Sequence, residues 1–210
     1  MTTRRMILAL IAAIAFCATG QSKPAAADEN RRQPKLDLKQ LKKLKVAEIK
    51  KNIESHHPAH FYILAGKLFS ANKRDEAVFW FYVGQLRYRI HLDANPKIDP
   101  TGDPALFTAL SAMTGQPINH YAFGDIPRLA KTIDDVLKWD AEHENKYTSR
   151  DEHPQAHKKN RDGIRKLQKY IVENEDEIKV RRNAPVKPAV EKDGQFDLSR
   201  LKEYLKKNGI

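Results

Sequence analysis

The sequence is nearly free of cysteine, which limits the chemistry and the cross-links open to it. Cys17 is the only cysteine among 210 residues. It lies in a segment that we expect to be removed, so the remaining chain is expected to have no disulfide and no thiol chemistry. A domain without disulfides depends on its hydrophobic core, and the residues after position 27 are numerous enough to form one.

Long apolar runs are scarce as well. The unbroken run at residues 6–16 is too short for a comfortable membrane span. It follows Arg4 and Arg5 and precedes three alanines at 25–27, an order typical of a secretory signal peptide. We therefore predict a signal peptide at residues 1–27 and a protein that is exported to the periplasm or secreted. An uncleaved anchor is the alternative.

Catalytic motifs are missing from the sequence. It has no glycine-rich phosphate loop, and its few serines do not lie in the strand–turn–helix context of a hydrolase nucleophile. We expect no catalysis and no cofactor. The enzyme alternative uses His120 with nearby acids, because histidine is the commonest general base.

A cluster of histidines raises the question of a metal site. His56, His57 and His60 lie close in sequence, but Pro58 suits the first position of a helix and leaves His56 outside it. A zinc site needs three or four converging ligands. We therefore predict no metal site from this spacing.

The chain is basic, with a formal charge of +11, of which +8 remains once Arg4, Arg5 and Lys23 leave with the signal. Basic exported proteins favour anionic partners. Nucleic-acid binding is not expected, because no helix-turn-helix, zinc-finger or aromatic RNA-binding signature is present.

Lysines crowd one face of a predicted helix at residues 35–53, whose other face carries an apolar stripe. One interpretation is a helix that binds an anionic membrane or cell-wall polymer. The favoured interpretation is a helix that packs its stripe on the domain, because the stripe has no Trp or Phe to anchor it in an interface. The candidate surface-binding residues are Lys39, Lys42, Lys43 and Lys50.

Residues 56–89, HHPAHFYILAGKLFSANKRDEAVFWFYVGQLRYR, predict two antiparallel helices joined by a short polar connection. Small residues at the facing positions let the helix axes approach closely. The pattern resembles one tetratricopeptide or Sel1-like repeat over about residues 58–91, which implies a hairpin that serves protein binding. The matching positions are Phe61, Leu64, Ala65, Leu68, Ala77, Phe81 and Gly84.

The rest of the chain contains further helical patterns and no strand pattern, so the predicted class is all-α: an irregular helical domain at 35–183 built around one hairpin. Residues 28–34 are expected to be flexible. The other predicted helices cover 104–113, 126–143, 154–182 and 197–210, with a loop at 115–125 and a linker at 184–196. Gly115 is expected to end the first of these helices and Asp125 to cap the second. Three segments, DEAVFWFYVGQLRYR, QPINHYAFGD and TIDDVLKWD, are together similar to a bacterial group of unknown function, which implies no activity.

Two polar, aromatic stretches are the candidate partner-binding surfaces, because Arg and Tyr dominate protein interfaces and loops often carry binding. The alternative is local: capping of turns, and pairing of arginine with acids of a neighbouring helix. The candidates are Gln85, Arg87, Tyr88 and Arg89 in the second helix of the hairpin, and Gln116, Asn119, His120 and Tyr121 in the predicted loop.

The sequence thus predicts an exported helical module that binds an unidentified protein as an adaptor or as an inhibitor of a secreted or envelope protein. The alternatives are an envelope-surface binder that uses the lysine-rich helix and an enzyme that uses His120.

Overall fold

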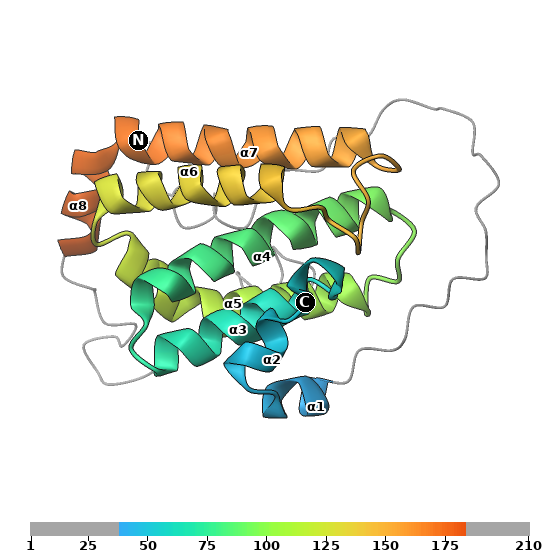
Figure 1. Ribbon diagram of the computed structural model, residues 1–210. Coiled ribbons are helices and arrows are strands. Elements are labelled where there is room, and N and C mark those ends of the chain that lie inside the picture. Colours follow the sequence, from blue (N-terminus) through green and yellow to red (C-terminus); the bar gives the residue numbers. More distant parts are fainter. Residues whose placement is uncertain (1–37, 184–210) are drawn as a thin grey trace, which may run out of the picture. The chain divides into compact units, whose positions relative to one another are not determined.

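The computed structural model describes residues 38–183, which form eight α-helices and one short 3-10 helix without a strand among them (Figure 1). The all-α prediction is confirmed for this part of the chain. No helix in it has both the length and the hydropathy that a membrane span needs. The predicted signal peptide, flexible N-terminus, linker and C-terminal helix lie outside the described residues.

The predicted hairpin is present as α3 (Ala59–Ser70) and α4 (Arg74–Ala94). Its helices pack closely at Gly84, where an added Cβ atom would lie 2.8 Å from Phe61 Cβ. Asn72, in the connection, has a φ of 60°, a left-handed conformation that asparagine tolerates and that commonly ends a helix. The spacing of small and large residues therefore predicted this packing correctly.

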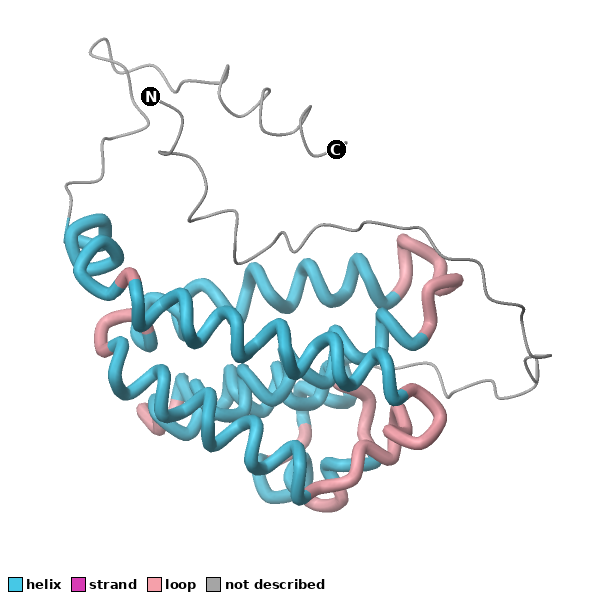
Figure 2. The backbone as a smooth tube through the Cα atoms, turned by 90° about the horizontal axis from the view of Figure 1, so that it is seen from above, coloured by secondary structure: helices cyan, strands magenta, loops and turns pink. Residues whose placement is uncertain are grey.

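Helix α4 is the centre of the bundle and contacts α3, α5, α6 and α7. α6 (Ile126–Glu142) and α7 (Pro154–Glu173) lie side by side on one side of α4, and α3 lies on the other (Figures 1 and 2). This position explains why α4 is buried on several sides and why its buried residues include Arg87 and His91 as well as apolar side chains. The largest fully buried apolar and aromatic side chains are Phe61, Tyr62, Leu64, Leu68, Phe81, Leu86, Tyr88, Ile90, Ile118 and Ile126, together with Ile49.

The single helix predicted at residues 35–53 is wrong. The structure has two short helices, α1 (Leu38–Lys43) and α2 (Val46–Lys50), followed by the 3-10 helix η1 (Ile53–Ser55). The helix is interrupted at Leu44 and Lys45, so that Leu41, Ile49 and Ile53 can all be buried. Since α1 and α2 both contact α3, the apolar stripe packs on the domain, as the favoured interpretation held.

The loop predicted at residues 115–125 is also wrong, because α5 runs from Asp103 to Ala122 without stopping at Gly115. Gly115 does not end the helix. Its missing side chain makes room for Phe81, whose Cζ would lie 2.8 Å from an added Cβ. Pro117 lies inside the helix on its exposed side, where water can satisfy the carbonyl that loses its N–H partner.

The single helix predicted at residues 154–182 is two helices in the structure. α7 ends at Glu173, and α8 (Glu175–Asn183) begins after Asn174. The predicted cap of α6 is confirmed, because the Asp125 carboxylate accepts a hydrogen bond from the Arg128 N–H at 3.0 Å.

Candidate functional site

The partner-binding role predicted for Arg87 is wrong for this fold, because its side chain is only 1 % exposed. Its Nε donates to Asp140 Oδ1 at 2.8 Å, and its two terminal nitrogens donate to the carbonyls of His143 and Glu144. The guanidinium also lies over the Trp139 ring at 5.1 Å. Burial lowers the pKa of Arg87, while Asp140 opposes the shift. The local alternative, pairing with an acid of a neighbouring helix, is the one observed.

The other candidates on α4 also face inward. Tyr88 is fully buried, so its predicted partner contact is wrong, and its hydroxyl donates to the backbone carbonyl of Asp103 at 3.3 Å. Gln85 and Arg89 are half-buried between α4 and α5, where Gln85 donates to Ser111 and Arg89 lies over the Phe107 ring. This stretch of α4 packs against the rest of the domain.

The second predicted patch lies largely at the surface. A groove with a volume of about 730 Å³ opens where the start of α4, the end of α5 and α8 meet. We call it the arginine groove. Its lining residues are Phe69, Arg74, Gln116, Pro117, His120, Tyr121, Gly124, Arg128 and Arg182. Three of the four residues predicted from the supposed loop, Gln116, His120 and Tyr121, are therefore among them.

Two arginines flank the Tyr121 ring in this groove. The guanidinium of Arg74 lies 5.5 Å from the ring centre and that of Arg128 lies 5.0 Å from it. Arg74 also lies over the Phe69 ring at 5.6 Å. The tyrosine hydroxyl donates to Asp75 Oδ1 at 2.8 Å. Cation–π contacts hold the guanidinium planes and leave the N–H groups at their edges able to bind acceptors, which for Arg128 are Asp75 and Asp125.

The remaining groove residues have clear positions. Arg182 Nη1 donates to the backbone carbonyl of His120 at 2.7 Å, which joins α8 to the end of α5. Asn119, the fourth predicted residue, is half-buried and accepts from the Tyr82 hydroxyl at 3.1 Å. The nearby acids Asp75 and Asp125 bind Arg128. This geometry places those acids on the arginine and not on the His120 ring.

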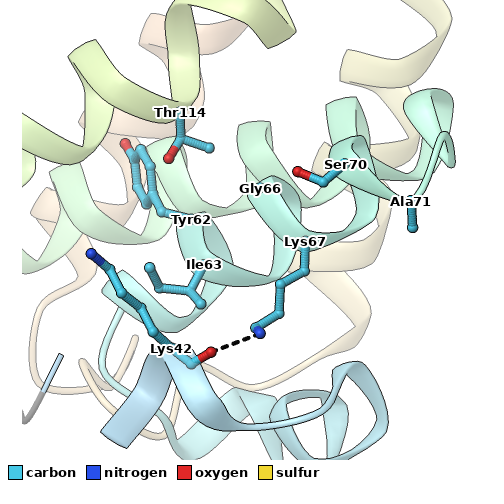
Figure 3. Close-up of a pocket in the computed structure, with 8 residues that line it drawn as sticks. All are labelled: Lys42, Tyr62, Ile63, Gly66, Lys67, Ser70, Ala71 and Thr114. Atoms are coloured by element: carbon cyan, nitrogen blue, oxygen red, sulfur yellow. Dashed lines mark hydrogen bonds between the residues drawn. The ribbon is translucent and has the colours of Figure 1, made fainter. Parts of the chain in front are cut away.

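The lysines proposed for surface binding are divided between two environments. Lys39, Lys42 and Lys43 are exposed on α1. Lys50 forms an ion pair with Glu76 and lies 5.8 Å from the Trp80 ring centre. A second, shallower groove of about 560 Å³ has Lys42 on one wall, and there Lys67 donates to the Lys42 carbonyl at 2.8 Å (Figure 3).

A polar cluster at the other end of α4 was not predicted. His57 Nε2 lies 3.2 Å from Asp103 Oδ1, and His91 Nε2 lies 2.9 Å from Asp103 Oδ2. Within residues 38–183, these three side chains form the one group of histidine, cysteine and acidic residues whose ligand atoms converge, all within 4.8 Å of one another. We call it the histidine–aspartate cluster. The Tyr147 ring packs against both imidazoles.

The hydrogen bonds define the tautomers in this cluster. The Ala59 N–H donates to His57 Nδ1 at 3.1 Å, so the neutral imidazole carries its proton on Nε2 and donates it to Asp103. The two imidazoles hold the pKa of Asp103 well below its usual range. No sequence pattern indicates this cluster, because its members are 34 and 12 positions apart and come together only through the packing of α3, α4 and α5.

The other histidines near Pro58 do not join that cluster. The rings of His56 and His60 stack with their centres 4.6 Å apart. Burial, together with the neighbouring imidazoles, lowers the pKa of His60 to about 4. His57 turns away from these two rings and toward Asp103.

Comparison with known proteins gives little guidance. No family model and no solved structure matches the chain. An uncharacterized protein of Haemophilus influenzae is 32 % identical over 91 residues. That match covers 41 % of this chain and only 33 % of the relative, so the chain corresponds to about a third of that protein. The resemblance of the hairpin to a tetratricopeptide or Sel1-like repeat stays a prediction.

Proposed function

We propose that this chain is an exported, non-catalytic helical module that binds a protein partner through the arginine groove. The observation that carries the proposal is the stack of Arg74 and Arg128 on the Tyr121 ring. Arg and Tyr are the residue types that most often dominate binding energy at protein interfaces. The role of adaptor or of inhibitor fits a module of this size.

The charges of the groove favour an acidic partner. Three arginines and His120 line it, and their nearest acids are Asp75 and Asp125. Both acids lie at the rim with side chains 64 % and 44 % exposed. A partner carboxylate that approaches Arg74 would meet a guanidinium already held between two aromatic rings, which reduces the entropy lost on binding. We therefore expect the partner to insert an Asp or Glu side chain.

The two alternatives receive less support. An amphipathic helix on a membrane needs its apolar stripe free, but Leu41 and Ile49 are buried in the domain. An enzyme that uses His120 needs an acid to orient the ring, while the nearby acids bind Arg128 and Tyr121. Neither alternative is part of the proposal.

The test is affinity capture with matched variants. The immobilised exported chain is exposed to envelope and secreted fractions of its source cell, and bound proteins are identified by mass spectrometry. We expect one stoichiometric protein that resists moderate salt and is lost with the double variant Arg74→Ala and Tyr121→Ala. The control is Arg165→Ala, which removes an exposed arginine of α7 outside the groove. Equal capture by both variants would exclude the groove.

A further inference from the structure

We propose that the histidine–aspartate cluster is a binding site for a divalent transition-metal ion, with Zn²⁺ the best match. Two imidazoles and one carboxylate form a set of nitrogen and oxygen ligands that zinc accepts, with a fourth position left for water. The proposal is independent of the arginine groove, because His91 and Arg74 lie near opposite ends of α4, about 25 Å apart at a helical rise of about 1.5 Å per residue.

The spacing of the ligand atoms suits a tetrahedral ion. Zinc bonds of about 2.0–2.1 Å to nitrogen and oxygen place two ligands about 3.3–3.4 Å apart. The observed separations from Asp103 are 3.2 Å for His57 and 2.9 Å for His91. The two histidines reach different oxygens of the carboxylate, and the ligand atoms of all three residues lie within 4.8 Å of one another, so the side chains must draw closer together around an ion that replaces the two hydrogen bonds.

The ligands are held by packed elements and not by a mobile loop. His57 precedes α3, His91 lies in the last turn of α4 and Asp103 begins α5. The two histidine side chains are 9 % and 5 % exposed, whereas Asp103 is 25 % exposed and gives solvent a route to the site. A rigid, partly dry set of ligands is what a selective metal site requires.

Polar groups around the two imidazoles determine which ring nitrogen can carry the proton when zinc binds. An imidazole that binds zinc through Nε2 carries its proton on Nδ1 and donates it to a neighbouring acceptor. For His91 that acceptor is the Thr148 hydroxyl, 3.4 Å from Nδ1, and the Asn95 side-chain nitrogen, 3.3 Å from the same atom, must turn its N–H away. For His57, however, Nδ1 faces the Ala59 N–H at 3.1 Å, so metal binding must break this hydrogen bond and turn the amide to another acceptor. The amide of Ala59 is therefore a specific reporter of binding at His57.

The experiment uses the full chain with Cys17→Ser, so that the thiol does not compete, after removal of metal with a chelator. Zn²⁺ is titrated by calorimetry, and Co²⁺ is added separately for its visible absorption. We expect one equivalent of Zn²⁺ to bind, an intense tetrahedral Co²⁺ spectrum, and an affinity lower by about 100-fold or more in Asp103→Asn, which keeps the size of the side chain but is a poor ligand. His120→Ala is the control and should bind as the parent does.

A second measurement protects the test against a variant that fails to fold. In the parent chain, the ¹⁵N–¹H signal of the Ala59 amide should shift on addition of Zn²⁺, while the amide of Tyr121 should not. Absence of binding by the folded parent chain would overturn the proposal. So would binding that Asp103→Asn retains, or binding that leaves the Ala59 amide unchanged.

Discussion

Arginine and tyrosine lie together at both ends of α4, but their environments differ. Toward its C-terminus, Arg87 and Tyr88 are buried and bonded to other elements of the domain. At its N-terminus, Arg74 is exposed and rests on the rings of Phe69 and Tyr121. The comparison teaches that an arginine beside a tyrosine is available to a partner only where its guanidinium is not buried with an acid of another helix.

Removal of one arginine at each end should give the largest contrast. Arg87→Ala leaves the fully buried Asp140 carboxylate with only part of its compensation, so we expect a loss of about 3–5 kcal/mol in the free energy of unfolding. Arg74→Ala removes an exposed side chain and should cost less than about 1 kcal/mol. Denaturant unfolding measures both. Similar losses for the two variants would contradict the comparison.

Replacement of a glycine should have different effects on stability at a tightly packed and at a loosely packed position of the hairpin. In Gly84→Ala the new Cβ meets Phe61 Cβ at 2.8 Å, and we expect a loss of about 1–3 kcal/mol in unfolding free energy. Gly66→Ala is the matched control, because its Cβ would make an ordinary contact of 3.7 Å with Thr114 Cγ2. That variant should be neutral or more stable by up to about 1 kcal/mol, since alanine favours a helix. A stable Gly84→Ala variant would show that the helices are less closely packed.

Low pH should reduce the free energy of unfolding of the domain through two of its histidines, His60 and His157. The pKa of His60 is lowered to about 4 and that of His157 is lowered by burial. Between the ordinary histidine pKa of about 6.5 and those lower values, the unfolded chain binds protons that the folded chain does not, so stability falls as pH falls. The lowered pKa of Asp103 continues the loss below about pH 4.

The measurement for this prediction is the unfolding free energy as a function of pH. The slope between pH 6.5 and pH 4 should decrease when His60 is replaced by Gln. An unchanged slope in His60→Gln would show that this histidine does not link folding to pH.

Two tyrosine hydroxyls give the smallest contrast. The Tyr82 hydroxyl donates to Asn119 inside the domain, so Tyr82→Phe should cost about 1 kcal/mol of stability. The Tyr121 hydroxyl donates to Asp75 at the surface, so Tyr121→Phe should cost less than about 0.5 kcal/mol while the ring stays between its arginines. Thermal unfolding of the two variants makes the comparison, and a reversed order would contradict it.

The sequence predicted what depends on local spacing. The hairpin of α3 and α4, the cap at Asp125 and the packing of the N-terminal stripe all follow from residues within a few turns of one another. The prediction failed where a residue distant in the sequence determines the local structure. Gly115 reads as a helix end, but Phe81 of α4 occupies the space that it leaves and the helix continues.

The candidate sites follow the same rule. Gln116, His120 and Tyr121 were singled out because loops often carry binding, and all three line the arginine groove, although their element is a helix and not a loop. Arg87 was misread because its partner Asp140 is 53 positions away. The cluster of His57, His91 and Asp103 requires three helices to be placed before it exists.

The central claim is that the protein partner binds at the N-terminal end of α4 and not at its C-terminal end. Hydrogen–deuterium exchange of the chain, with and without the captured partner, tests it most directly. The account predicts that the partner slows exchange at residues 74–76 and 116–124 and leaves residues 56–60 and 88–103 unchanged. Protection confined to the latter segments, or to α1, would contradict it.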